Sequence, residues 1–419
     1  MTSPVAFSTS VLRTSLRKTV LTGLVVYALT LLAGAAQAQT FEVVHSFARV
    51  PLGFAPYGGL VQDARGALYG TTNNGGGSGS GSVYKLTYRP SGWIMTALVV
   101  FEHDGNGYSP ATRLTLGPDG AFYGTTTFGG YPGGCGGSGC GTIFRLNPAG
   151  LGRTVLYRFS DQHESYWPNG ALSFDSAGNM YGTTPVGGTV GNGTVFKLVR
   201  NGSQWNYSVI YNFDDASKGW APVAGVIVDS AGNLYGTTVN GGGDSSYGAV
   251  YELSPAAGGW SSRVLHSFHP DDNDGGWPEA SLIMDAAGNM YGTASGGGTG
   301  RGGTVFELSP SGNNWDYRTI CNLTTVADGS GGPHDSVLMD AAGNLYGTTY
   351  DEGAYGQGSV FKVVQSNGNW GCYTIHDFNS PNDGANPIGD LMKDSQGNIF
   401  GTAWTGGPYG GGTAWEIIP

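Results

Sequence analysis

The chain has 419 residues, including 76 glycines, 23 tyrosines, 17 phenylalanines and 10 tryptophans. The glycines follow no three-residue period, which excludes collagen, and the aromatic residues can build a large core, which excludes a disordered chain. With 19 Lys and Arg against 30 Asp and Glu, the net charge is −11. Such a chain repels phosphate backbones, so we expect no nucleic-acid partner.

The first 38 residues have the organisation of a secretory signal peptide. Basic residues ending at Lys18 precede an apolar run from 20 to 32, and Ala36-Gln37-Ala38 follows as a small-x-small cleavage site. A membrane anchor is the alternative, but this run is too short for a hydrocarbon core of about 30 Å. We therefore expect cleavage of residues 1–38, export, and a mature chain, 39–419, with no membrane span.

From residue 41 onward the chain repeats one phrase seven times, at start-to-start spacings between 54 and 58 residues. The phrase is an aromatic residue followed by Gly-Thr, and usually by a second Thr. Its copies begin at Tyr69, Tyr123, Tyr181, Tyr235, Tyr291, Tyr346 and Phe400. So steady a period indicates one structural unit repeated along the chain.

The unit from 278 to 323 shows what is repeated. It contains four strand-length runs separated by turn residues, with no helical periodicity. The runs are 280–285, 290–293, 303–308 and 317–323. Four short strands in about 50 residues are typical of a β-propeller blade.

The two ends of the repeat region predict how a ring closes. Residues 41–47 match the fourth strand of a unit, as in 262–268, whereas the C-terminal run 412–417 matches the third strand. The N-terminal strand would therefore complete the last blade and leave no exposed sheet edge. We predict an all-β, seven-bladed β-propeller of four-stranded antiparallel blades, in one monomeric domain spanning 39–419.

Two repeated residues have architectural explanations. In six units an Asp begins a type I turn three positions before a Gly, as Asp285 does before Gly288. Unit two has Gly117-Pro118-Asp119-Gly120 instead.

The Gly of the repeated phrase lies inside a strand, where it costs about 0.5–1 kcal/mol relative to Ala. We therefore expect a backbone or an aromatic ring to pass close to it.

Ligand binding is expected on one face of the ring. Strands of a blade alternate in direction, so the loops between second and third strands and those between blades emerge together, and these loops vary most. Those between blades combine aromatic rings, which stack on apolar sugar faces, with carboxylates, which bind hydroxyls. The candidate ligand-binding residues are Asp104, Tyr108, His163, Trp167, Asp215, Trp220, His269, Asp274, Trp277 and His334. The alternative is that the rings fill gaps between blades and the Asp residues cap the loops.

Catalysis has less support in the sequence, and we predict no catalytic residue. No Gly-x-Ser-x-Gly, His-Glu-x-x-His or phosphate-binding motif is present. His45, His266 and His376 occupy one repeated slot of the fourth strand, which indicates architecture. The other histidines lie in variable loops, so a glycan lyase or hydrolase is the alternative function. We expect no cofactor. Structural calcium at the acidic run 271–275 is a weak alternative, because the run lacks the spacing of a calcium loop.

Four cysteines are consistent with an oxidising compartment. Cys135 and Cys140 lie five apart in a glycine-rich loop, and we predict a disulfide between them. A zinc half-site is the alternative, but no second Cys or His pair has matching spacing. The pairing of Cys321 and Cys372 stays open, because equivalent strands of separate sheets diverge.

The unit at 178–198 resembles the GloVer tandem repeat of exported bacterial proteins called choice-of-anchor proteins. The resemblance rests on Gly178-Asn-Met-Tyr-Gly-Thr-Thr184, on Gly187-Gly188 and on Gly193-Thr-Val-Phe-Lys-Leu198. It covers nearly the whole mature chain and implies export, often with a C-terminal surface-sorting segment, whereas this chain ends inside its last predicted blade. The resemblance implies no catalytic residues. We predict an exported, non-enzymatic propeller that binds a polysaccharide or another extracellular ligand, with a purely structural surface module as a further alternative.

Overall fold

A computed structural model describes residues 39–49, 52–76, 78–147, 152–161, 165–243, 246–269, 273–324 and 331–419. The part from Phe41 to Ile418 forms one compact unit. The predicted signal peptide, residues 1–38, lies outside the described residues.

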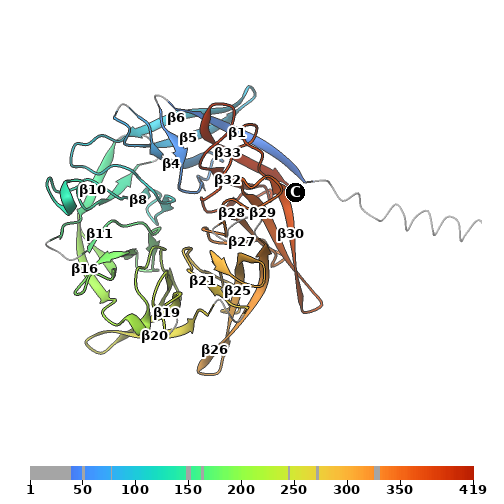
Figure 1. Ribbon diagram of the computed structural model, residues 1–419. Helices are drawn as coiled ribbons and strands as arrows, with labels where there is room; N and C mark the ends of the chain where they lie inside the picture. Colours follow the sequence, from blue (N-terminus) through green and yellow to red (C-terminus); the bar gives the residue numbers. More distant parts are fainter. Residues whose placement is uncertain are drawn as a thin grey trace, which may run out of the picture. The chain divides into compact units, whose positions relative to one another are not determined.

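Seven four-stranded antiparallel sheets follow one another along the described chain, and Figure 1 shows them arranged as the blades of a ring. From the inner to the outer strand, blade 1 consists of β3 (Val61–Gln62), β4 (Leu68–Asn74), β5 (Ser82–Arg89) and β6 (Gly92–Val100), and blade 2 of β7 (Thr115–Leu116), β8 (Phe122–Thr126), β9 (Thr142–Leu146) and β10 (Arg153–Arg158). Blade 3 consists of β12 (Ser173–Phe174), β13 (Met180–Thr184), β15 (Thr194–Asn201) and β16 (Gln204–Asn212), and blade 4 of β17 (Ile227–Val228), β18 (Leu234–Thr238), β19 (Ala249–Ala256) and β20 (Gly259–Ser267). Blade 5 consists of β22 (Ile283–Met284), β23 (Met290–Ala294), β25 (Arg301–Ser311) and β26 (Asn314–Thr324), and blade 6 of β27 (Leu338–Met339), β28 (Leu345–Thr349), β29 (Ser359–Ser366) and β30 (Asn369–Asp377). Blade 7 consists of β31 (Met392–Lys393), β32 (Ile399–Ala403), β33 (Gly410–Ile418) and β1 (Thr40–Ala48).

The loops between blades and those between second and third strands contain shorter elements. Strand β2 (Phe54–Pro56) pairs with β4, β11 (Ser165–Tyr166) with β14 (Val186–Gly187), and β21 (Gly275–Gly276) with β24 (Gly296–Gly297). Two 3-10 helices, η1 (Cys135–Gly137) and η3 (Ala216–Lys218), also belong to these described loops. Cys135 and Cys140 form a disulfide across η1, with their Cα atoms 5.3 Å apart.

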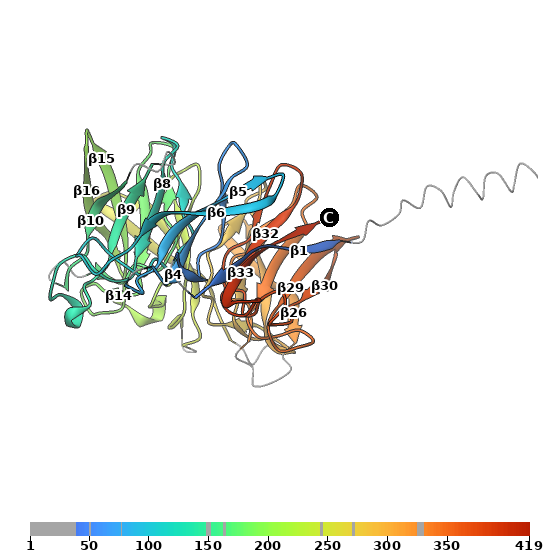
Figure 2. The ribbon, with the colours of Figure 1, turned by 90° about the horizontal axis from the view of Figure 1, so that it is seen from above.

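The ring closes as the sequence predicts. Strand β1 pairs with β33 from the opposite end of the chain and becomes the outer strand of blade 7. Figures 1 and 2 both show β1 running along β33. The prediction of seven blades closed by the N-terminal strand is therefore confirmed.

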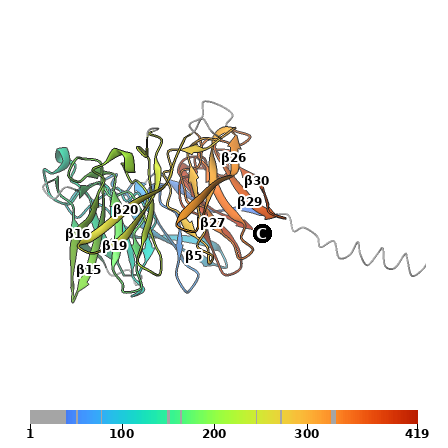
Figure 3. The same cartoon turned by 90° about the horizontal axis from the view of Figure 1, so that it is seen from below.

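The alternating strand directions separate two faces of the ring. Figure 3 shows the β5–β6 and β15–β16 hairpins projecting on the same side of the unit. The loops between blades and those between second and third strands occupy the other side, which we call the loop face.

The glycine of each repeated phrase faces an aromatic ring of the next strand in its own blade. A β-carbon built on Gly182 would lie 2.4 Å from Cζ of Phe196. The equivalent glycines face the rings of Tyr84, Phe144, Tyr251, Phe306, Phe361 and Trp415. Because only Gly leaves room for these rings, the predicted close approach is confirmed in all seven blades.

The repeated Asp caps the turn between the first two strands. The carboxylate of Asp175 accepts hydrogen bonds from the backbone N–H of Ala177 at 3.0 Å and of Asn179 at 2.8 Å. It also accepts one from the hydroxyl of Tyr181 at 3.0 Å. This last bond links the turn to the repeated phrase, and it recurs in blades 1, 2, 4, 5 and 6.

Successive blades meet on the loop face through a repeated Gly–Pro contact. Gly193 has φ +101°, and a β-carbon built on it would lie 2.7 Å from Cδ of Pro222 in the next blade. The equivalent pairs are Gly81–Pro110, Gly141–Pro168, Gly248–Pro278, Gly303–Pro333, Gly358–Pro387 and Gly412–Pro56. Since the last pair joins blade 7 to blade 1, the closing joint is built like the others.

The outer strands of neighbouring blades meet at a second repeated joint. Three of these joints stack two rings face to face, at centroid distances of 3.9, 3.7 and 3.6 Å. The pairs are Tyr157–Tyr207, His266–Tyr317 and His376–Phe41. Between blades 5 and 6 the same place holds a disulfide between Cys321 and Cys372, whose Cα atoms are 5.9 Å apart. The expected divergence of equivalent strands is therefore too small at this joint to keep the two cysteines apart.

Candidate functional site

The inner ends of the loops between blades surround a cavity of about 630 Å³. Every blade contributes residues that directly follow its repeated Pro. They are 57–59, 111–113, 169–171, 223–225, 279–281, 334–335, Ile388 and Asp390. We call this cavity the mouth, and its volume is within the range of about 300–1,000 Å³ typical of ligand pockets.

The two sides of the mouth differ in chemistry. Blades 2 to 4 contribute mostly small or apolar side chains, among them Ala111, Ala171, Val223 and Val239. Blades 5, 6, 7 and 1 contribute Glu279, His334, Asp335, Tyr350, Asp390, Trp404 and Tyr57. We call this second group the polar-aromatic sector. A ring of equal blades does not require such an asymmetry, so the sector is a candidate for function.

The aromatic side chains of this sector form a continuous arc. The ring of Tyr57 lies edge-on to that of Trp404 at a centroid distance of 6.2 Å. Trp404 lies 6.5 Å from Tyr350, which in turn lies 5.4 Å from the imidazole of His334. The arc thus joins blades 1, 7 and 6 along one wall of the mouth.

A histidine–carboxylate pair continues the arc into blade 5. Nδ1 of His334 lies 2.6 Å from a carboxylate oxygen of Glu279. Burial alone would lower the pKa of His334, but the hydrogen bond and charge of Glu279 outweigh it and raise that pKa above its ordinary value. The Glu279 side chain is 34% exposed, so it remains accessible to a ligand.

Asp335 is a buried carboxyl group at the base of the sector, with only 5% of its surface exposed. It accepts a hydrogen bond from the hydroxyl of Thr348 at 2.8 Å. Burial, and then the charge of Asp390, raise the pKa of Asp335 to about 7. The corresponding residue in the other blades is Gly58, Thr112, Gly170, Ala224, Ala280 or Gly389. The fold therefore does not need a carboxyl group at this position.

Asp390 connects the sector to the opposite wall. Its carboxylate accepts a hydrogen bond from the backbone N–H of Ser336 at 3.1 Å and lies 3.7 Å from Nε of Arg113. Burial first, and then the charges of Asp335 and Glu279, raise the pKa of Tyr57. The carboxyl groups of Asp335, Asp390 and Glu279 and the phenol of Tyr57 therefore lie close enough to influence one another electrostatically.

One predicted ligand residue, His334, lines the mouth. Another, His163, lies outside the described residues. The remaining candidates lie in the loops around the mouth, in four different blades.

The aromatic candidates lie where a loop between blades packs against a loop between second and third strands. The backbone N–H of Trp220 donates to the carbonyl of Asn240 at 2.8 Å, and that of Trp277 to the carbonyl of Tyr247 at 2.7 Å. Each indole is 37% exposed. The rings of Tyr108 and Trp167 both lie against that of Phe128, at centroid distances of 5.5 and 6.4 Å. These side chains form an outer rim, and their role in ligand binding stays a prediction.

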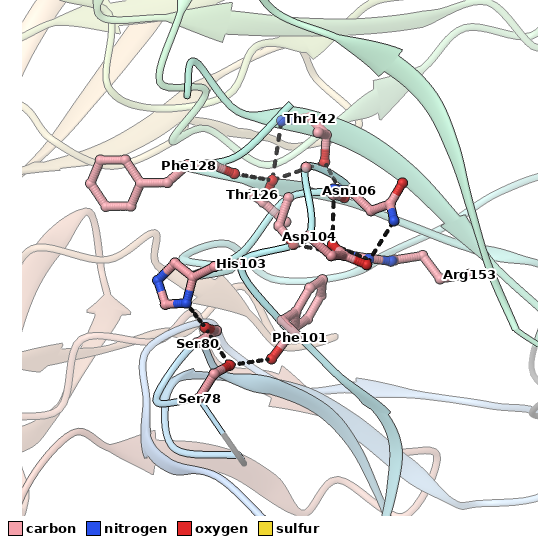
Figure 4. Close-up of polar contacts among 12 residues, drawn as sticks. Ser78, Ser80, Phe101, His103, Asp104, Asn106, Thr126, Phe128, Thr142 and Arg153 are labelled. Atoms are coloured by element: carbon pink, nitrogen blue, oxygen red, sulfur yellow. Dashed lines mark hydrogen bonds and ion pairs between the residues drawn. The ribbon is translucent and has the colours of Figure 1, made fainter. Parts of the chain in front are cut away.

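The acidic candidates all have partners within their loops. Figure 4 shows Asp104 between Asn106, whose side-chain amide donates to it at 2.7 Å, and Arg153. Asp215 accepts from the backbone N–H of Ser217 at the start of η3.

Asp274 is buried, lies 2.8 Å from Nε2 of His266, and accepts from the backbone N–H of His269, whose side chain is exposed. The contacts of Asp104, Asp215 and Asp274 fit the alternative that the Asp residues cap their loops.

Most residues of the mouth cannot be recognised from the composition of the loops. They can be recognised where one blade departs from the residue that the other blades share. Asp335 stands where the other six blades have Gly, Ala or Thr. Glu352 likewise stands where they have Gly, and it is buried with one carboxylate oxygen lacking a hydrogen-bond partner. Aligning the seven units and searching for such departures would have marked blade 6.

The described part of the chain holds neither a cluster of metal-ligating side chains nor a long apolar helix. Its residues contain no group of three or more His, Cys, Asp or Glu side chains placed to hold a metal ion. Asp271 and Asp272, from the run compared with a calcium loop, lie outside the described residues. No described helix is long and apolar enough to cross a bilayer.

Comparison with known proteins shows the same repeat. The Gloeobacter/Verrucomicrobia repeat matches residues 22–238, 131–285, 178–330 and 242–419. No curated protein matches the chain.

Solved structures of similar fold include two with TM-scores above 0.5. One is PorZ of Porphyromonas gingivalis, described as an essential bacterial surface component of the type-IX secretion system, with TM-score 0.53 and 16% identity over 89% of this chain. This chain spans only 47% of that protein. The other is a fungal alcohol oxidase of the AA5 family in complex with copper, with TM-score 0.56 and 16% identity, covering 91% of this chain and 77% of the oxidase. At such identity the likeness shows the fold alone.

Proposed function

This chain belongs to the Gloeobacter/Verrucomicrobia repeat family, and we propose that it is an exported propeller that binds a carbohydrate in its mouth. The observation that carries the proposal is the arc of Tyr57, Trp404 and Tyr350 beside the carboxylate of Glu279. Aromatic faces stack on the apolar faces of sugar rings, and a carboxylate accepts hydrogen bonds from their hydroxyls.

Export is supported by the N-terminal segment and the cysteines. Residues 1–38 have the pattern of a signal peptide. Two disulfides, Cys135–Cys140 and Cys321–Cys372, suit an oxidising compartment. A place at the cell surface, as described for PorZ, is part of the proposal.

A glycan array with the purified mature chain tests the proposal. We expect a defined set of glycans to bind, and Trp404→Ala to abolish that binding. Tyr88→Ala is the control, because it removes an exposed ring from the β5–β6 hairpin, on the side of the ring away from the loop face. Trp220→Ala and Trp277→Ala test separately whether the outer rim also contacts the glycan. If the array is blank, or if Trp404→Ala binds normally while thermal melting shows both proteins folded, the mouth is not a sugar site.

A glycan-cleaving enzyme is the second candidate, and Asp335 is the observation that favours it. A carboxyl group with a pKa of about 7 suits a general acid near neutral pH. Release of reducing ends or unsaturated sugars from glycans bound on the array would support it. Activity that Asp335→Asn leaves unchanged would remove Asp335 from that role.

A further inference from the structure

We propose that the sugar recognised by the mouth is an amino sugar, whose ammonium group binds at Glu279 while its ring stacks on the aromatic arc. This inference rests on the proposed function, because it names the class of carbohydrate that the site takes.

The charge balance of the mouth is the first observation. Its lining contains three carboxyl groups, those of Glu279, Asp335 and Asp390, against one guanidinium and no lysine. The guanidinium, on Arg113, lies beside Asp390. Among the described residues, Glu279 has only His334 beside it, at 2.6 Å, and the charge of that imidazole depends on pH, so Arg113 is the one permanent cation of the lining.

The accessibility of these carboxyl groups decides where the ammonium group binds. The side chain of Glu279 is 34% exposed, whereas Asp335 is 5% exposed. A ligand would therefore contact Glu279 directly, and Asp335, with a pKa of about 7, would add only part of a negative charge near neutral pH. His334, at 2.6 Å from Glu279, limits the approach to the second carboxylate oxygen.

The aromatic arc is the second observation, because ring faces attract cations as well as apolar surfaces. A cation within about 6 Å of a ring centroid is attracted by the negative face of the ring, most strongly over Trp. Trp404 is the central ring of the arc, 6.2 Å from Tyr57 and 6.5 Å from Tyr350. An amino sugar offers a flat apolar face and a positive charge in one residue.

The length of the arc favours a sugar over a polypeptide cation. The ammonium group of a lysine side chain would pair with the carboxylates, but the side chain would contact only one ring of the arc. Three rings in succession, in a cavity of about 630 Å³, match several sugar residues in a row. A polypeptide ligand is therefore an outcome of the test.

Calorimetric titration of the mature chain with three trisaccharides near neutral pH tests the inference. The probes are the β-1,4-linked trimers of glucosamine, N-acetylglucosamine and glucose, and trilysine serves as a fourth ligand. Because a hydrogen bond to a charged group is worth about 1.5–3 kcal/mol, we expect the glucosamine trimer to bind at least about tenfold more tightly than the other two. Glu279→Gln should remove that preference. Glu102→Gln, the same change at an exposed glutamate that does not line the mouth, should keep it.

Each outcome is decisive. Equal affinity for the three trimers overturns the amino-sugar inference and leaves carbohydrate binding standing. No binding of any trimer by a folded chain, but binding of trilysine, overturns both. A glucosamine preference that survives in Glu279→Gln overturns the assigned position of the ammonium group.

Discussion

Cys321 and Cys372 are bonded at the place where three other pairs of blades stack two rings. Cys321 occupies the slot held by His266 in blade 4, and Cys372 the slot held by Tyr317 in blade 5. The fold sets the distance across this joint, and different side chains can then fill it. The disulfide is thus a local substitute for stacking.

We predict that Cys321→His combined with Cys372→Tyr partly replaces the disulfide. Removing a native disulfide costs about 2–5 kcal/mol, whereas an aromatic pair adds about 0.5–1.5 kcal/mol beyond burial. The double variant should therefore unfold at lower denaturant than the native chain and at higher denaturant than Cys321→Ser with Cys372→Ser. Equal midpoints for the two double variants would contradict the equivalence of the joints.

A second prediction concerns the glycine inside the repeated phrase. Gly182→Ala should destabilise the chain by about 1–3 kcal/mol, because its β-carbon would overlap the ring of Phe196. The same substitution in a Phe196→Leu background should cost less, since the ring is gone. Denaturant unfolding of the four proteins gives the coupling energy, and the idea fails if that energy is zero.

Asp335 makes stability depend on pH. Its folded pKa of about 7 exceeds its unfolded pKa of about 3.9, so the unfolded state loses its proton first as pH rises. The contribution of Asp335 to the free energy of unfolding is therefore largest below about pH 4, falls between about pH 4 and 7, and then stays low.

Asp335→Asn keeps a hydrogen-bond partner for Thr348 and removes this dependence. At about pH 8 the variant should have a higher melting temperature than the native chain. Its free energy of unfolding should be higher by up to a few kcal/mol, because each pKa unit by which the folded and unfolded states differ corresponds to about 1.4 kcal/mol. At about pH 4 the difference should largely vanish. Asp316→Asn, an exposed control on β26, should show the native profile, and parallel profiles for all three proteins would refute the prediction.

The turn Asp residues provide an internal comparison. Asp175 accepts from Tyr181, whereas blade 7 has Phe400 at the tyrosine position, so Asp394 accepts only from its own turn. Asp175→Ala should cost more than Asp394→Ala, by about 1 kcal/mol for one hydrogen bond. Tyr181→Phe should account for the difference, and equal losses in both blades would contradict it.

The features that the sequence predicted are those with a period. Seven copies of Tyr-Gly-Thr, the strand at 41–47 and the turn Asp each repeat or complete a pattern, so their places follow from one unit. The positions that line the mouth repeat, but their side chains do not, and Tyr57, Glu279, Asp335 and Trp404 come from four different blades. Only the ring geometry brings these residues together. The candidates Asp104 and Asp274 were chosen by loop composition, and local capping explains that composition equally well.

The pairing of β1 with β33 also constrains how the chain is made. Residues 40–48 are synthesised before all other described strands of the ring, and their partner at 410–418 after all of them. Strand β1 must therefore remain without its partner strand throughout synthesis and any passage across a membrane. Because the two strands are so far apart in the sequence, we expect their pairing to be a slow step of folding. A truncated product could never complete itself, so its exposed edges would mark it for aggregation or proteolysis.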